Sequence, residues 1–209
     1  MHIPDGVLSV PVVTTGLAAT GAMTAYAVSR TRTSELPKIS LLTGAFFVVS
    51  LVSLPLPGPT CVHPMLAALL GILPGSKAVI AVLVGLGLQA FLLQYGGIST
   101  LGINTLLVVV PALISAQGFV MLRSRMPTVL GRGALCGAVA TILVGIFLAV
   151  VMYFSDERYG MGYFSLINFI LFSHLVLGLV VEAPLTGFAL RYLNKVRPSL
   201  IRATHLFTK

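Results

Sequence analysis

The chain has 209 residues, of which 57% are hydrophobic and only 9% charged, and its mean hydropathy is +1.04. A soluble globular domain carries about 25% charged residues, so this composition leaves too little polar surface to cover a soluble fold. The formal net charge of +8 would suit nucleic acid binding, but basic residues in a membrane protein usually set its orientation. We therefore predict an integral membrane protein that lies in a lipid bilayer and binds no nucleic acid.

The first six residues, MHIPDG, combine a histidine at position 2 with a turn sequence. A signal peptide opens with basic residues and continues into an apolar run. This start lacks them, so we expect Met1 to be the true N-terminus. Proline fixes φ, aspartate can bond its own backbone and glycine tolerates positive φ, which makes Pro4-Asp5-Gly6 a turn signal. The turn would fold the preceding residues back into the protein, with Ile3 buried as an anchor and Asp5 available to orient a metal ligand.

Seven apolar segments follow in chain order, and a membrane-spanning helix needs about 20 mostly apolar residues. They cover residues 8–29, 39–56, 62–75, 78–95, 104–122, 133–154 and 164–193. The third is short for a span, so we expect it to tilt little or to begin below the membrane surface. No linker divides the chain. The prediction is an all-α, polytopic membrane protein, a single domain of residues 1–209 with seven transmembrane helices.

The basic residues predict the orientation of these helices. With the N-terminus outside and the C-terminus cytoplasmic, the inner loops and the tail hold every Lys and Arg of the chain except Arg158. This is the distribution that the positive-inside rule requires. An even number of spans would put both termini on one side and spoil it. The predicted topology places His2 and His63 on the same external side, far apart in sequence but able to meet in space.

Met1 and His2 together form a ready chelator. The α-amino nitrogen, the deprotonated backbone nitrogen of His2 and His2 Nδ1 can close two fused rings around one metal ion. Three nitrogens in a plane favour a square-planar ion, which points to Ni²⁺ or Cu²⁺, whereas Zn²⁺ prefers a tetrahedron. His63 is the obvious candidate for the fourth donor. We therefore expect the segment 1–7 to bind a metal ion together with His63.

Other interpretations of these histidines remain open. A histidine falls at position 2 of many proteins by chance, usually in a disordered N-terminus, and a lone His63 is more often a helix-start or core residue. The chain would then be a metal-independent permease or channel in which His2 is incidental, or a structural membrane scaffold. His174 and Glu182 lie in the last apolar segment, where ionisable residues suggest a function. For this pair we expect helix–helix or partner contacts rather than a second metal site.

Sequence motifs of common enzymes are absent. The chain has no GxxxxGK[ST] phosphate loop, no HExxH zinc motif and no nucleophile elbow. We predict that it is not an enzyme, and that any ATP hydrolysis coupled to it takes place in partner subunits.

Five stretches carry a resemblance to a known family. They are MHIPDGVLS at 1–9, ELP at 35–37, PGPTCVH at 57–63, LLQYGGISTLGINT at 92–105 and KVRP at 195–198. These stretches resemble the NikM/CbiM family, the substrate-capture (S) components of nickel and cobalt energy-coupling factor (ECF) transporters. The resemblance implies a seven-helix fold in a prokaryotic cell membrane with the N-terminal residues inserted among the helices from outside. It also implies uptake of Ni²⁺, with Co²⁺ as the close alternative.

The resemblance implies a set of site residues as well. The metal ligands would be the amine of Met1, the amide and imidazole nitrogens of His2 and the imidazole of His63. Asp5, Thr60 and Asn104 would support these ligands without binding the metal themselves. The partners implied are a transmembrane T component, two cytoplasmic ATPase subunits and often a small companion membrane protein.

The sequence departs from the family pattern at two positions close to His63. Cys61 stands where we expect serine, and Pro64 stands where we expect leucine. Proline is acceptable in the first turn of a helix, so Pro64 is expected to sharpen a helix start at His63. It leaves the aim of that imidazole open.

Overall fold

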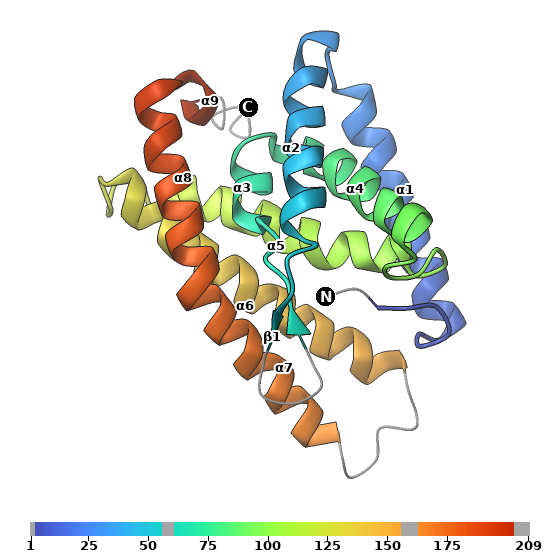
Figure 1. The fold of residues 1–209 in the computed structure, drawn as a ribbon. Coiled ribbons are helices and arrows are strands. Elements are labelled where there is room, and N and C mark those ends of the chain that lie inside the picture. Colours follow the sequence, from blue (N-terminus) through green and yellow to red (C-terminus); the bar gives the residue numbers. More distant parts are fainter. Residues whose placement is uncertain (1–2, 56–60, 156–162, 203–209) are drawn as a thin grey trace.

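In the computed structural model of the chain, residues 3–55, 61–155 and 163–202 are described (Figure 1). The predicted site residues Met1, His2 and Thr60 fall outside these ranges. Helices account for most of the described part. A short antiparallel pair of strands, β1 (Leu54–Pro55) and β2 (Cys61–Val62), accompanies them.

Five helical segments of the described part are long and apolar enough to cross a membrane, at residues 10–29, 75–93, 101–121, 129–155 and 167–196. The first four contain the helices α1 (Val10–Ser29), α4 (Ala78–Leu93), α5 (Leu101–Met121) and α6 (Val129–Ser155). The fifth covers most of the last helix, which is built from α7 (Tyr163–Leu177), η3 (Gly178–Glu182) and α8 (Ala183–Val196). Three short helices, η1 (Thr33–Glu35), η2 (Gly75–Lys77) and α9 (Ser199–Arg202), and the two helices α2 (Leu36–Val49) and α3 (Ala67–Ile72) make up the rest. The prediction of a multi-pass helical membrane protein is thereby confirmed at this coarser level.

Two of the seven predicted helices are shorter than expected, the second of them by more than half. The segment 39–56 gives α2 (Leu36–Val49), and the segment 62–75 gives only the six residues of α3 (Ala67–Ile72). Proline supplies the reason, because it removes a backbone donor and restricts the residue before it. Four prolines interrupt the chain between α2 and α3, at positions 55, 57, 59 and 64. Apolar composition alone does not distinguish these two short helices from helices long enough to span a membrane.

The last long helix contains one wider turn. The segment η3 is a π-helix between α7 and α8, and such single wide turns often occur at functional sites. Figure 1 shows α7 and α8 running on through it across the whole molecule. The wide turn ends at Glu182, which is 1% exposed.

The core is centred on α3. All six residues of this helix are buried, and the Gly71 position is in direct contact with the backbone of Ala112 in α5. A similar close approach joins α1 to α5, where Thr20 Oγ1 donates to the Gly102 carbonyl at 2.8 Å. A Cβ at Gly102 would lie 2.6 Å from Leu17 N. Small residues of this kind allow helix backbones to approach closely inside a membrane, where packing rather than water drives association.

A second apolar cluster includes the start of the described chain. It consists of Ile3, Leu8, Ile103, Leu107, Leu148 and Ile170. Residues from the N-terminal segment thus pack among side chains of α5, α6 and α7. In Figure 1 the segment runs back from the start of α1 toward the middle of the molecule.

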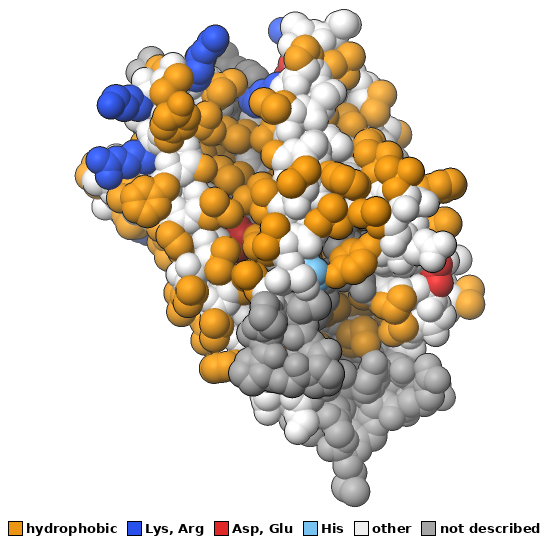
Figure 2. All heavy atoms as spheres, in the orientation of Figure 1, with side chains coloured by type: hydrophobic (Ala, Val, Ile, Leu, Met, Phe, Trp, Pro, Cys, Tyr) orange, Lys and Arg blue, Asp and Glu red, His pale blue; other side chains and the backbone are white. Residues whose placement is uncertain are grey.

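Basic side chains gather at one end of the molecule. Figure 2 shows Lys and Arg where α8, α9 and the α1–α2 connection lie. At this end Lys77 pairs with Glu35, and Lys38 Nζ donates to the Leu73 carbonyl at 2.5 Å, after the last turn of α3. The hydrogen bond from Lys77 lowers the pKa of Glu35. Lys38 of α2 and Lys77 of η2 therefore fix the ends of α2, α3 and α4 relative to one another.

Candidate metal centre

The backbone of Ile3 is clamped to the start of α5. Its N–H donates to Asn104 Oδ1 at 3.0 Å, and its carbonyl accepts from Asn104 Nδ2 at 3.0 Å and Thr100 Oγ1 at 2.6 Å. The Asn104 side chain thus pairs with both polar groups of Ile3. Since the Ile3 side chain is 4% exposed, the prediction that this residue is a buried anchor is confirmed. The clamp holds the residue that directly follows the predicted chelator.

Asp5 binds the loop that precedes α5. Its carboxylate accepts from Ile98 N at 3.1 Å, Ser99 N at 2.8 Å and Ser99 Oγ at 2.5 Å. The hydrogen bond from the Ser99 side chain, assisted by the backbone donors, lowers the pKa of Asp5. A Cβ at Gly97 would lie 2.6 Å from Asp5 N, so only glycine fits there. Asp5 thereby holds the N-terminal segment against the 94–100 loop.

The predicted turn at Pro4-Asp5-Gly6 is present. Asp5 and Gly6 form a turn, and Gly6 has φ of +80°, a conformation that glycine adopts without strain. The turn separates the clamped Ile3 from α1, which begins at Val10.

His63 is buried on the other side of this loop. Its side chain is 3% exposed, with Nδ1 3.1 Å from the Val52 carbonyl oxygen and Nε2 2.6 Å from the Tyr95 hydroxyl. The two rings meet edge to face, with centroids 5.4 Å apart. Desolvation lowers the pKa of His63, which favours the neutral imidazole that metal ligation requires.

Glu182 fixes the backbone that follows His63. The chain leaves His63 through Pro64 and enters α3 through Leu66, whose φ is +50°. Glu182 Oε1 accepts from Met65 N at 2.5 Å and from Leu66 N at 3.0 Å. A carboxylate from the last helix therefore fixes the backbone two and three residues after the histidine. The sequence analysis predicted helix–helix or partner contacts for Glu182. No spacing in the sequence indicated that it would bind the backbone of Met65 and Leu66.

Tyr95 is a site residue that the sequence did not single out. It follows Gln94, which closes α4 with φ of +53°, and its N–H donates to the Gln89 carbonyl at 3.1 Å. Gln89 in turn donates through Nε2 to Ser50 Oγ at 2.7 Å, which ties α4 to α2. The only signal for Tyr95 was its place in the YGG stretch that carried the family resemblance.

His174 lies at the contact between α7 and α6. It is 2% exposed and its Nδ1 lies 2.8 Å from the Ile170 carbonyl oxygen. A Cβ at Gly145 in α6 would be 2.8 Å from the Cβ of His174. Within residues 3–55, 61–155 and 163–202, no group of three or more His, Cys, Asp or Glu side chains could hold a metal ion.

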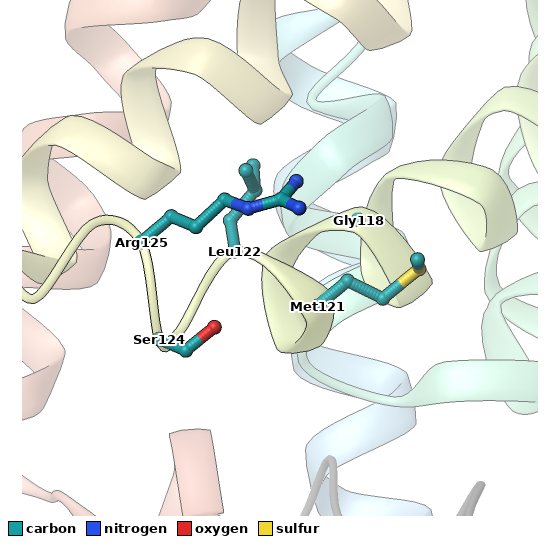
Figure 3. Close-up of a pocket in the computed structure, with 5 residues that line it drawn as sticks. All are labelled: Gly118, Met121, Leu122, Ser124 and Arg125. Carbon is teal, nitrogen blue, oxygen red and sulfur yellow. The ribbon is translucent and has the colours of Figure 1, made fainter.

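The structure thus brings two sets of predicted residues to one loop. Asp5 and the Ile3–Asn104 clamp meet its end, and His63 meets Tyr95 at its start. A surface pocket lies instead at the opposite end of α5 (Figure 3), lined by Gly118, Met121, Leu122, Ser124 and Arg125. The candidate centre is therefore the 94–100 loop with the chain segments that it holds.

The fold and the site together define a class of protein: a multi-pass helical membrane protein whose N-terminal segment folds back into the protein. Residues 2–200 match the family described as the cobalt uptake substrate-specific transmembrane region, CbiM, and the chain belongs to this family.

Individual relatives agree with this assignment. A protein of Haemophilus influenzae to which metal transport is ascribed is 27% identical over the full length of both chains. A fused protein of Archaeoglobus fulgidus, NikMN, to which nickel transport is ascribed, is 28% identical over 96% of this chain and 68% of its own. A crystal structure of a transition metal transporter is 25% identical, covers 100% of both chains and superposes with a TM-score of 0.82. The chain is thus a membrane component of nickel or cobalt transport.

Proposed function

We propose that this protein is the substrate-capture component of an ECF transporter and binds Ni²⁺ on the external side of a prokaryotic cell membrane. The proposed ligands are four nitrogens: the Met1 amine, the His2 amide and Nδ1, and the His63 imidazole. The observation that carries the proposal is the clamp on Ile3. Asn104 and Thr100 fix the third residue inside the fold, directly after the two residues that would supply three of the four nitrogens.

Asp5 and Asn104 support the site through the backbone in this proposal. Both hold the N-terminal segment against the protein rather than touching the metal, and outer groups of this kind position metal ligands. Thr60 is proposed to act similarly from the segment before His63. The family description names cobalt, so Co²⁺ is the second candidate, although planar nitrogen ligands and the usual affinity order favour Ni²⁺ over Co²⁺.

The proposed topology has seven spans with the N-terminus outside and the C-terminus in the cytoplasm. Support comes from the basic end of the molecule, where α8, α9 and the α1–α2 connection meet, because basic residues favour the cytoplasmic side. The proposed partners are a transmembrane T component, two cytoplasmic ATPases and a small companion membrane protein. ATP hydrolysis in these partners would drive inward release of the ion.

Nickel affinity is expected to fall at least about 100-fold as the pH drops from about 8 to about 6, because the metal must displace the protons of the α-amine, whose reference pKa is near 8, and of the His2 backbone amide. The sign follows from competition: at low pH the protonated nitrogens cannot bind the ion. Titration calorimetry of the purified protein with NiCl₂ at three pH values measures the effect, with circular dichroism as a control for folding. An affinity that stays flat across this window argues against the amine and amide ligands. Absence of nickel binding at every pH favours the metal-independent permease or channel.

A further inference from the structure

The surroundings of His63 determine which ring nitrogen carries its proton. Nδ1 lies 3.1 Å from the carbonyl oxygen of Val52, and a carbonyl oxygen can only accept a hydrogen bond. Nδ1 is therefore the protonated nitrogen. In a neutral imidazole the other nitrogen is then an acceptor. It follows that the Tyr95 hydroxyl, 2.6 Å away, donates its proton to Nε2.

A metal ion needs the same lone pair. Since Nδ1 carries a proton and is turned toward Val52, Nε2 is the nitrogen of His63 that can coordinate. One lone pair cannot accept a hydrogen bond and bind a metal ion at the same time. We propose that the Tyr95 hydroxyl is a latch that occupies the Nε2 lone pair of His63 in the metal-free protein and must leave it before the ion binds. The latch rests on the proposed function and describes how the same site is regulated.

The position of Tyr95 suits a group that must move. It is half-buried, and its neighbours Gln94 and Gly96 both have positive φ, +53° and +92°. The far end of the same loop holds Asp5 through Ser99. Seating of the N-terminal segment and withdrawal of the hydroxyl therefore act on one short loop.

The latch also assists release. When the ion leaves, the hydroxyl returns to Nε2 and restores the hydrogen bond. The buried nitrogen therefore has a hydrogen-bond donor in the metal-free protein and needs no water molecule. The proton stays on the Tyr95 oxygen throughout, and the hydrogen bond to Nε2 forms as the bond between Nε2 and the metal ion breaks. The latch lowers the affinity for the ion and makes its release easier.

Tyr95→Phe removes the competing donor and keeps the ring, so it is expected to tighten nickel binding about two- to tenfold, the equilibrium worth of a typical net hydrogen bond. The measurement is a competition titration of the full-length purified protein with NiCl₂ and a chelator of known affinity. Tyr192→Phe is the matched control, because Tyr192 is 65% exposed on α8, and it should leave affinity unchanged. A merely structural role for Tyr95 predicts weaker binding, since its loss would loosen the seat of His63.

The outcomes separate the two proposals. If the unmodified protein binds nickel and Tyr95→Phe binds it equally or more weakly, the latch is wrong and the proposed function stands. If the unmodified protein binds no nickel, the proposed function fails and the latch fails with it. As an independent readout, ¹⁵N resonances of His63 in the metal-free protein should show an Nδ1–H tautomer whose Nε2 shift changes in Tyr95→Phe. An Nε2–H tautomer overturns the latch whatever the nickel data show.

Discussion

Replacing His63 by alanine is expected to lower nickel affinity by more than about 100-fold, because even the loss of a residue that merely orients a ligand typically costs 10- to 100-fold. His63 is buried and held from both sides, by Val52 and Tyr95, so its imidazole is already fixed before the ion arrives. Without it the N-terminal chelator can supply three nitrogens at most. The measurement is nickel affinity by competition with a chelator.

Two controls separate a lost ligand from a damaged fold. Adding free imidazole to the His63→Ala protein should restore part of the affinity, because the deleted side chain leaves space of matching shape. His205→Ala removes a histidine that the proposal does not use and should bind nickel normally. Unaltered affinity in His63→Ala would eliminate His63 as the fourth donor.

The second large effect is expected at Glu182. Replacement by leucine, which is of similar size, leaves the buried N–H groups of Met65 and Leu66 without their acceptor, and each unpaired group costs about 1–3 kcal/mol. We expect Glu182→Leu to lower the unfolding temperature and to weaken nickel binding, because the backbone beside His63 loses its position. Thermal unfolding of the metal-free protein and a nickel titration measure the two effects.

Glu182→Gln is the matched variant. Its amide oxygen can accept the same two hydrogen bonds, so stability and nickel affinity should remain close to those of the unmodified protein. A small loss is expected, since within the described residues the second carboxylate oxygen has no hydrogen-bond partner and the amide nitrogen would take its place. If glutamine proves as damaging as leucine, the residue acts through its charge and not as an acceptor for the backbone.

Local sequence patterns predicted the parts of the fold that depend on local chemistry. The turn at Pro4-Asp5-Gly6 follows from three residue types with known backbone preferences, and the structure has it. The burial of Ile3 follows from the same turn, which directs the chain back into the protein. Hydropathy correctly indicated a multi-pass helical protein, since long apolar helices satisfy their own backbone groups in a bilayer.

Features that depend on distant partners could not be predicted in this way. The segment at 62–75 is apolar enough for a helix, yet only Ala67–Ile72 is α-helical. Besides the prolines before it, Glu182 binds the backbone N–H groups of Met65 and Leu66, and Leu66 has a φ of +50° that an α-helix does not allow. The contact between Glu182 and Leu66 joins residues 116 positions apart. The role of Tyr95 could not be predicted for the same reason. A tyrosine beside two glycines does not indicate that its hydroxyl contacts a histidine from another segment.

The central claim is that the first nitrogen of the chain binds the ion. The most direct measurement is the amount of nickel bound per purified protein when a short tag extends the N-terminus, compared with the same tag at the C-terminus. The amine becomes an amide in the first protein and stays free in the second. We predict about one nickel ion for each C-terminally tagged chain and almost none for each N-terminally extended chain. Tight binding of one ion per chain in the extended protein would contradict the account.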